Sequence, residues 1–355
     1  MFAKQTVLSA SLVALLGAGP ARAEPSASPQ ADDEAPPLKP PKRKRTGTFS
    51  IGAGMSSDEW FIATARLEQP DLFGTGKYLG LSATISSKRE QMMLRYADPS
   101  VLGTPFALTA DLYTDYKVMP GFTRRGSGFS TALTHPLGHN VHAFIGYRLE
   151  AIEAESLIVA RSTDSAPTLR SGLLSAVRTG ISYDTPGTSF GVSVERADQR
   201  LGSDFNETRL NAWANTHQPL GPFTLHLSGS FSAIADPSGV PLNERLFLGS
   251  SREVRGYRAY TLGPVDGLGR PIGGDTKVLG RAELELPIVR RIGLSVVGFA
   301  DAGVVLDRTT GQGELGRSVG VGLLWRSPIG PLRFDWALPL DGGKPALVFG
   351  FGFGF

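Results

Sequence analysis

Few side chains in this sequence are spaced for metal binding. Cysteine is absent from the 355 residues, which excludes thiolate metal sites, thiol nucleophiles and disulfides. Three of the five histidines, His135, His139 and His142, lie close together, but no carboxylate stands at a ligand spacing from them. We therefore interpret this trio as residues of a turn and the start of a strand, and expect no metal.

A second candidate for chemistry is the segment Gly74-Thr75-Gly76-Lys77, which is similar to the end of a phosphate-binding loop. Asp71 and Tyr78 stand where such a loop has glycine and serine or threonine, and no helical pattern follows. The segment is therefore interpreted as a turn between strands. The sequence also contains no nucleophile elbow or other catalytic spacing, so we expect neither a cofactor nor an enzymatic activity.

The N-terminus has the pattern of an export signal. A lysine at position 4 precedes an apolar stretch over 7–19, and Ala21-Arg22-Ala23 has the form of a cleavage site. The stretch is shorter than the roughly 20 residues that a membrane-spanning helix needs. Residues 1–23 are therefore predicted to be a cleaved signal peptide rather than an anchor.

Residues 24–46 are rich in proline, alanine and serine and end in the basic run Lys42-Arg43-Lys44-Arg45, a composition that predicts a disordered linker on the periplasmic side. Two interpretations of the basic run stay open: a solvated tail, or a segment that contacts anionic lipid headgroups. The net charge of only +3 does not fit a uniformly basic nucleic-acid-binding domain, and no nucleic acid partner is expected.

From residue 47 to residue 355 the pattern changes to short segments of alternating polar and apolar residues, separated by Gly, Pro and Asp. No later apolar run has the length of a membrane-spanning helix, so a membrane could be crossed only by strands. We predict an all-β fold, a 16-stranded antiparallel transmembrane β-barrel. The predicted strands are 47–55, 59–68, 77–87, 90–97, 106–116, 127–134, 140–152, 171–183, 188–197, 206–217, 223–234, 274–286, 291–305, 316–326, 332–338 and 345–355.

The connections between the predicted strands alternate in length. One set includes the compact turns 135–138, 185–187, 218–222 and 327–331, and the other contains the long segments 153–170 and 235–273. Short turns at one rim and long loops at the other are typical of barrels in the bacterial outer membrane, where we therefore place the chain, in contact with outer-membrane lipid.

The last predicted strand alternates phenylalanine with glycine and ends on an aromatic residue. Phe351, Phe353 and Phe355 fall on one face, which we expect to meet lipid. An aromatic final strand is also the kind of signal that barrel-assembly machinery recognises. The sequence therefore predicts that this machinery is a partner during biogenesis.

The C-terminal third resembles the BamA/TamA-type outer-membrane assembly superfamily, also known as the bacterial surface antigen family. Val254-Arg255-Gly256-Tyr257 is similar to that family's loop motif, and the turn at 72–76 is similar to the one between its second and third strands. Further similar segments are Arg245–Ser250, Gly263–Pro264, Ala282–Pro287, Gly298–Gly303 and Gly320–Arg333.

The resemblance implies that the long loop folds back into the lumen and is held there by its motif arginine. By match of the motif that residue is Arg255, and the implied acidic partners on the inner wall are Glu283 and Asp301. An arginine fork in a confined lumen needs a carboxylate, because bidentate pairing fixes both charge and orientation. Glu283 and Glu285 share one strand face, so both are expected to point inward.

Family members that assemble or secrete proteins carry periplasmic POTRA domains before the barrel, and residues 24–46 are too few for one. The sequence is therefore expected to be a POTRA-less member. Two functions are open: insertion or transport of protein or lipid substrates through a loop-plugged lumen or a lateral seam, with a protein substrate or a separate periplasmic partner, or a passive pore or surface antigen without clients. A barrel enzyme is disfavoured, because no paired catalytic side chains are visible.

Overall fold

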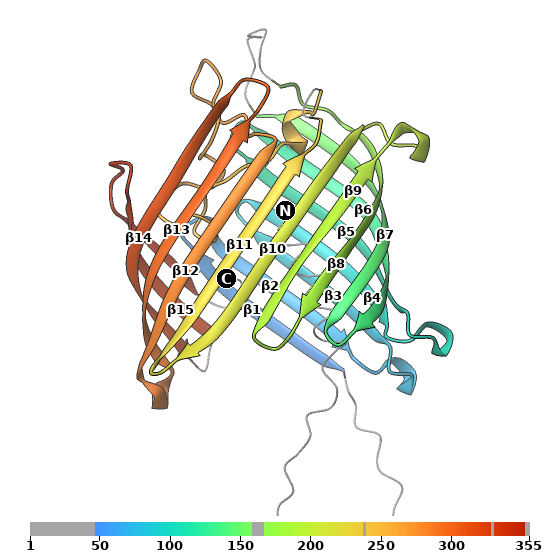
Figure 1. Ribbon diagram of the computed structural model, residues 1–355, viewed down its shortest axis with the longest axis horizontal. Coiled ribbons are helices and arrows are strands. Elements are labelled where there is room, and N and C mark those ends of the chain that lie inside the picture. The colour runs from blue at the N-terminus through green and yellow to red at the C-terminus, as the bar shows by residue number, and fades with distance from the viewer. Residues whose placement is uncertain (1–46, 158–166, 237–238, 328–329, 352–355) are drawn as a thin grey trace, which may run out of the picture.

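The computed structural model describes residues 47–157, 167–236, 239–327 and 330–351. Within these residues, sixteen antiparallel strands close into a barrel, which confirms the predicted fold class (Figure 1). The predicted signal peptide (1–23), the predicted linker (24–46), Phe353 and Phe355 lie outside the described residues. No helix in the described part of the chain is both long and apolar enough to cross a membrane.

Each strand pairs with its neighbours along the chain, and β1 pairs with β16 to close the barrel. The strands are β1 (Thr48–Ser56), β2 (Trp60–Gln69), β3 (Tyr78–Ser86), β4 (Arg89–Asp98), β5 (Ala107–Met119), β6 (Phe122–Gly138), β7 (Val141–Ser156), β8 (Gly172–Asp184), β9 (Thr188–Ala197), β10 (Glu207–Leu220), β11 (Phe223–Ile234), β12 (Thr276–Val289), β13 (Leu294–Asp307), β14 (Gln312–Ser327), β15 (Gly330–Pro339) and β16 (Ala346–Phe351).

The alternation of side chains determines which face of each strand meets the interior. In β13, Val297, Phe299 and Asp301 are buried, while the residues between them point outward. In β15 the outward side chains Phe334 and Trp336 are large, apolar and exposed. Because successive side chains of a strand point to opposite faces, this pattern gives the barrel an apolar outer surface and a largely polar interior.

Strand ends differ most from prediction at β6, which begins at Phe122 and runs through Gly138 rather than covering 127–134. The predicted turn at 135–138 was wrong, because the turn lies at 139–140 and the pairing of β6 with β7 shifts register between Pro136 and Gly138. That irregularity accommodates a proline, which lacks an N–H for the ladder. The charged start of β6 is stabilised by ion pairs of Arg124 inside the barrel.

The two longest connections, β7–β8 and β11–β12, lie at the same end of the barrel, which we name the loop rim. The opposite end, the turn rim, has the short connections 139–140, 185–187 and 221–222, but also the longer connections 70–77 and 99–106. The loop rim is more mixed than predicted, because it also has a two-residue turn at 87–88. β1 begins at the turn rim and β16 runs toward it, as an even number of strands requires.

Candidate functional site

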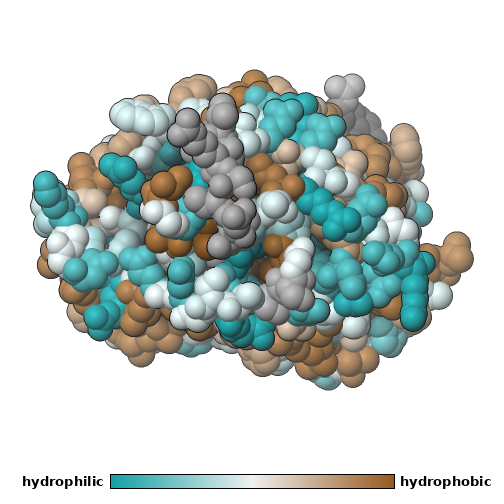
Figure 2. Space-filling model, turned by 90° about the horizontal axis from the view of Figure 1, so that it is seen from above, coloured by the Kyte–Doolittle hydropathy of each residue, from teal (hydrophilic) through white to brown (hydrophobic). Residues whose placement is uncertain are grey.

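The β11–β12 connection, residues 235–275, turns back toward the barrel interior. Isolated β-bridges pair Leu246 with Gly274 and Leu248 with Leu262, so the segment folds on itself. Leu248 and Leu262 then pack with Val305 of the inner wall in one buried apolar cluster. Seen from above the loop rim, hydrophilic and hydrophobic residues lie side by side on this face, and hydrophobic residues also gather along parts of its edge (Figure 2).

Arg255 of this loop is 1 % exposed and faces Asp301 of β13, which is 2 % exposed. Its Nε and one terminal nitrogen each donate to a different oxygen of Asp301 at 2.6 Å, and its backbone N–H donates to the same carboxylate at 3.2 Å. This is the bidentate, charge-assisted arrangement that fixes orientation as well as charge. The structure thus brings together the loop arginine and one of its two predicted partners.

The other terminal nitrogen of Arg255 contacts two further carboxylates. It lies 2.8 Å from Oε1 of Glu283 in β12 and donates to Oδ2 of Asp335 in β15 at 2.9 Å. Glu283 therefore lies beside Arg255, as the resemblance implied, whereas Asp335 was not predicted from the sequence. The guanidinium carbon also lies 3.5 Å from the ring centroid of Phe299, which places the cation over an aromatic face.

Two more arginines complete the group. Arg333 donates to both oxygens of Glu283 at 3.0 Å and to Asp335 at 2.8 Å, and Arg281 donates to Glu283 at 3.2 Å. We name this set the Arg255 cluster, and its three arginines balance its three carboxylates. Its members are Arg255, Arg281, Arg333, Glu283, Asp301 and Asp335.

A glycine in β14 makes room for this cluster. The register of the sheet pairs Gly320 with Phe299, and a Cβ at position 320 would lie 2.4 Å from the Phe299 ring and 2.1 Å from the carbonyl oxygen of Trp336. The second contact is with backbone, which cannot move as a side-chain tip can. Gly320 therefore permits the close packing on which the position of the Phe299 ring, and the arginine above it, depends.

Gly320→Ala is expected to destabilise the barrel by about 1–3 kcal/mol, the typical cost of overpacking a tight site. The matched control is Gly298→Ala in β13, where an added Cβ meets nothing within 4 Å. The temperature at which the purified protein loses its unheated mobility in an SDS gel measures the effect. Equal temperatures for the two variants would contradict the packing argument.

The residues beside Arg255 hold the loop in place by other means. Val254 is fully buried in the apolar cluster with Leu248, and Gly256 has a φ of +91°, a conformation that favours glycine. The hydroxyl of Tyr257 donates to Asp341 of the β15–β16 connection at 2.7 Å. Burial, and then this hydrogen bond, raises the pKa of Tyr257 to about 12, so the residue remains a neutral donor at physiological pH.

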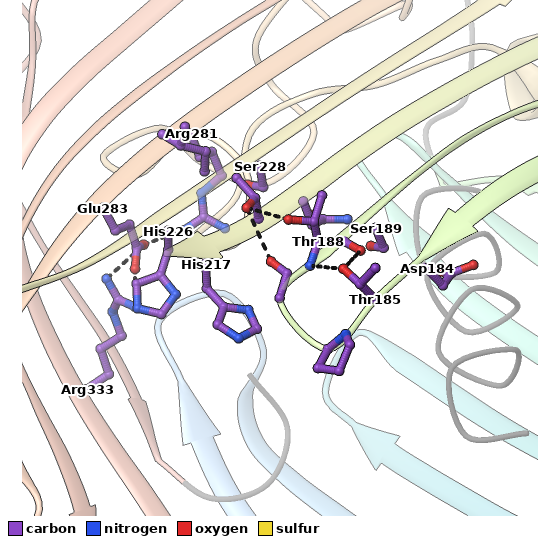
Figure 3. A pocket seen from close by; sticks show the side chains of 15 residues that line it. Asp184, Thr185, Thr188, Ser189, His217, His226, Ser228, Arg281, Glu283 and Arg333 are labelled. Carbon is purple, nitrogen blue, oxygen red and sulfur yellow. Dashed lines mark hydrogen bonds and ion pairs between the residues drawn. The ribbon is translucent and has the colours of Figure 1, made fainter. Parts of the chain in front are cut away.

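Below the Arg255 cluster, a cavity of about 440 Å³ extends toward the turn rim (Figure 3). Glu283, Arg281 and Arg333 form one side of it, and the β8–β9 turn at 185–187 forms part of the other. His217 and His226 also line it, with ring centroids 6.3 Å apart. Among the described residues, this cavity reaches from the β8–β9 turn at the turn rim to the Arg255 cluster.

Other sequence predictions fall outside this site. Glu285 points inward as expected but pairs with Arg326 rather than with the loop. His135 packs against Phe106, with ring centroids 4.6 Å apart at the turn rim. Among the described residues, no group of three or more His, Cys, Asp or Glu side chains could hold a metal ion.

The closing strand has its described end at Phe351, whose Cα partner in β1 is Met55. Beside this pair, Ser56 of β1 pairs with Gly350 of β16. These pairs join the first strand to the last and close the barrel at a seam.

The missed members of the cluster could have been found from a specific signal. Arg333 and Asp335 are charged residues that alternate with the apolar Phe334 and Trp336 along one predicted strand. In a barrel whose outer face meets lipid, such an alternation places the charges on the inside. It does not show which of the inward charges meet, because that depends on the strand register.

An apolar outer surface, a polar interior and a closed antiparallel ladder define this chain as an outer-membrane β-barrel. Comparison with known proteins identifies the family. The Omp85 superfamily domain matches residues 71–355, which is most of the chain. The chain therefore belongs to the Omp85 superfamily.

Related sequences and structures agree with this assignment. The chain is 27 % identical over 330 residues to outer membrane protein assembly factor BamA of Nitratidesulfovibrio vulgaris, and 27 % identical over 374 residues to BamA of Neisseria meningitidis serogroup B. These matches cover 89 % and 84 % of this chain but 42 % and 45 % of the relatives. The chain thus spans less than half the length of these curated relatives.

Solved structures show the same fold at lower identity. BamA from Haemophilus ducreyi lacking POTRA domains 1–3 superposes with a TM-score of 0.74 at 20 % identity, covering 88 % of this chain and 70 % of that one. CdiB from Escherichia coli gives a TM-score of 0.60 at 14 % identity, covering 86 % and 62 %. Both support the barrel architecture.

Proposed function

We propose that this barrel inserts protein substrates into the outer membrane or passes them across it, and that the loop 235–275 keeps its lumen closed between substrates. The observation that carries the proposal is the Arg255 cluster, in which a buried loop arginine contacts carboxylates from three strands. The description of the BamA relatives as assembly factors supports it. In this proposal the chain is not an enzyme.

The loop also reaches the seam. The backbone N–H of Ser251 donates to Oδ2 of Asp58 at 2.6 Å, and Asp58 lies in the connection between β1 and β2. One loop therefore contacts both the strands around Arg255 and the β1–β2 hairpin beside the seam. This link supports a mechanism in which release of the loop and opening of the seam occur together.

Opening the seam would expose the unpaired edges of β1 and β16 to lipid, where unsatisfied backbone groups are costly. A substrate that offers its own strand edges would satisfy them by pairing. The favoured substrate is therefore an unfolded polypeptide able to form strands. Outer-membrane lipid, the machinery that inserts this barrel and a separate periplasmic protein are its other proposed partners.

The rival function is a passive pore, and the position of the loop inside the lumen is evidence against it. A pore needs an open lumen, whereas this interior is crossed by buried ion pairs between the loop and the wall. In the closed arrangement, Glu244 and Arg255 of the loop are each paired with an opposite charge of the wall inside the lumen.

Insertion can be tested with the full chain in phospholipid vesicles. A urea-denatured eight-stranded outer-membrane barrel serves as the probe, and its folding is followed by the mobility shift between unheated and heated samples. We expect the probe to fold faster than in protein-free vesicles. An identical time course in both kinds of vesicle would contradict the proposed function.

A further inference from the structure

We propose that a groove on the lipid-facing surface of the barrel binds the phosphate and one acyl chain of an outer-leaflet lipid, lipid A. The groove crosses the outer face of β10 to β14 and has a volume of about 700 Å³. Strands β10 to β13 run obliquely across the near side of the barrel (Figure 1). The groove lies on the opposite side of the barrel wall from the lumen, so this site is independent of the proposed insertion of proteins.

The side chains along the groove point away from the lumen. Ala300 and Ala302 are exposed and flank Asp301 in β13, which is buried inside the barrel. Leu227 of β11 and Val319 of β14 are 41 % and 37 % exposed and also line the groove. Because successive residues of a strand point to opposite faces, the groove opens toward lipid.

Small residues that meet across neighbouring strands form the floor of the groove. The register pairs Ala214 with Gly229, Gly229 with Gly280, and Gly280 with Ala302. Neither glycine has a positive φ. An added Cβ at Gly280 would meet nothing within 4 Å, and one at Gly229 would meet only a carbonyl oxygen, at 3.6 Å. Packing within the protein therefore does not require these glycines, and a glycine inside a strand often marks the close approach of a ligand.

An arginine stands at the loop-rim end of this row. Arg317 of β14 is the Cα partner of Ala302, is exposed and lines the groove. Its carbonyl accepts from the backbone N–H of Leu340 at 2.8 Å, and Leu340 directly follows the last residue of β15. Arg317 therefore lies level with the loop-rim end of that strand, at the height of the lipid headgroups.

The charge of Arg317 is available to a lipid. Within the described residues, no carboxylate lies within 4.0 Å of its guanidinium. Asp341 of the β15–β16 connection accepts from the hydroxyl of Tyr257 instead, at 2.7 Å. An arginine on the lipid face costs free energy at the bilayer centre and little near the headgroups. Its planar fork is suited to phosphate, so a headgroup phosphate is the group that fits here.

The row has the length that an acyl chain of one leaflet requires. Four strand spacings of about 4.8 Å separate β14 from β10, about 19 Å in all. At the other end of the row, Ala214 pairs with Phe190, near the start of β9 at the turn rim. Because strands of such barrels tilt by about 35–45°, a row across them descends by roughly 11–13 Å. One leaflet contributes about 15 Å of hydrocarbon, so a chain that starts beside Arg317 can follow the groove.

The position of the arginine selects the lipid of the external leaflet. Long loops lie outside the cell and short turns in the periplasm in barrels of this class, so the loop rim is the external side. The external leaflet of an outer membrane contains lipopolysaccharide, and its lipid A carries phosphates beside several acyl chains. Lipid A therefore offers the anion and the acyl chain together at the correct height.

Native mass spectrometry of the purified full chain in detergent, with lipid A added in increasing amounts, tests the site. We expect the wild type to bind one lipid A and Arg317→Gln to bind it at least about tenfold more weakly, because a charge-assisted contact is lost. Gly280→Leu should weaken binding to a similar extent, because the new side chain fills the groove. Heat-dependent mobility in SDS gels verifies that each variant is folded.

The matched control is Gly298→Leu. Gly298 lies on the same outer face, in β13, but does not line the groove, and an added Cβ there also meets nothing within 4 Å. This variant should bind lipid A like the wild type. Phosphatidylglycerol is the second probe, and it should bind the wild type more weakly than lipid A does.

The site is overturned if folded Gly280→Leu binds lipid A as tightly as Gly298→Leu. It is also overturned if folded Arg317→Gln binds lipid A as tightly as the wild type, and Gly280→Leu decides alone if Arg317→Gln does not fold. Tighter binding of phosphatidylglycerol than of lipid A would overturn the assignment to the external leaflet. The insertion assay with the wild-type chain is a separate measurement, so failure of the lipid site and failure of the proposed function are distinguishable.

Discussion

Arg255→Ala is expected to release the loop from the inner wall while the barrel stays folded. The change removes the cation that Asp301 binds bidentately and leaves Asp301, Asp335 and Glu283 with three negative charges against two arginines. Removing one partner of a buried ion pair costs about 3–5 kcal/mol. The hydrogen bonds between the strands do not depend on this side chain. The lost free energy therefore weakens the attachment of the loop to the inner wall rather than the barrel itself.

Proteinase K digestion measures this release. In the wild type the loop should resist cleavage, and in Arg255→Ala it should be cut between β11 and β12 while the strands remain protected. The matched control is Arg258→Ala, which removes an exposed arginine from the same loop. If both variants were cut as slowly as the wild type, Arg255 would not be what holds the loop.

A disulfide across the seam is expected to abolish stimulated insertion of the barrel probe. Met55 and Phe351 are Cα partners in β1 and β16, and directly opposed residues in an antiparallel pair lie within disulfide range. Because the chain has no native cysteine, Met55→Cys with Phe351→Cys gives one defined bond. Oxidised protein should act like protein-free vesicles, and a reductant should restore the faster folding.

The control for the cross-link is a cysteine pair away from the seam. Leu94 in β4 and Leu112 in β5 are also Cα partners with exposed side chains, so the double substitution should form a bond without loss of activity. Full activity of the oxidised seam variant would contradict lateral opening. Passage through the lumen alone would then be the remaining route.

The fold was largely predictable because lipid and water impose a simple rule on each strand. Period-two alternation identified all sixteen strands, since a residue that meets lipid must be apolar whatever its partner. Strand ends were harder. The beginning of β6 was missed because Arg124 is stabilised inside the barrel by Glu150 and Glu244, and no local pattern around position 124 shows those partners.

The candidate site was predictable only in part. The resemblance placed Arg255 near Glu283 and Asp301, which the structure brings together. Asp335 was missed because it reaches Arg255 through the pairing of β14 with β15, and that register cannot be derived from the composition of one strand. For the same reason the ion pairs of Glu244 with Arg124 in β6 and Arg209 in β10 were not predicted.

Three of the contacts that hold the loop lie on different parts of the barrel. Arg255 contacts β12, β13 and β15, Glu244 contacts β6 and β10, and Ser251 contacts the β1–β2 connection through Asp58. A segment fixed on opposite walls closes the space between them. A substrate that displaces one of these contacts would weaken the others, because the same segment from Glu244 to Arg255 carries them.

Single-channel conductance in planar bilayers tests most directly whether the loop closes the lumen. The wild type, Arg258→Ala and Arg255→Ala are compared at the same salt concentration and voltage. We expect small, rare openings for the first two and larger, longer openings for Arg255→Ala. Equal conductance and open time in all three would contradict closure of the lumen by the Arg255-held loop.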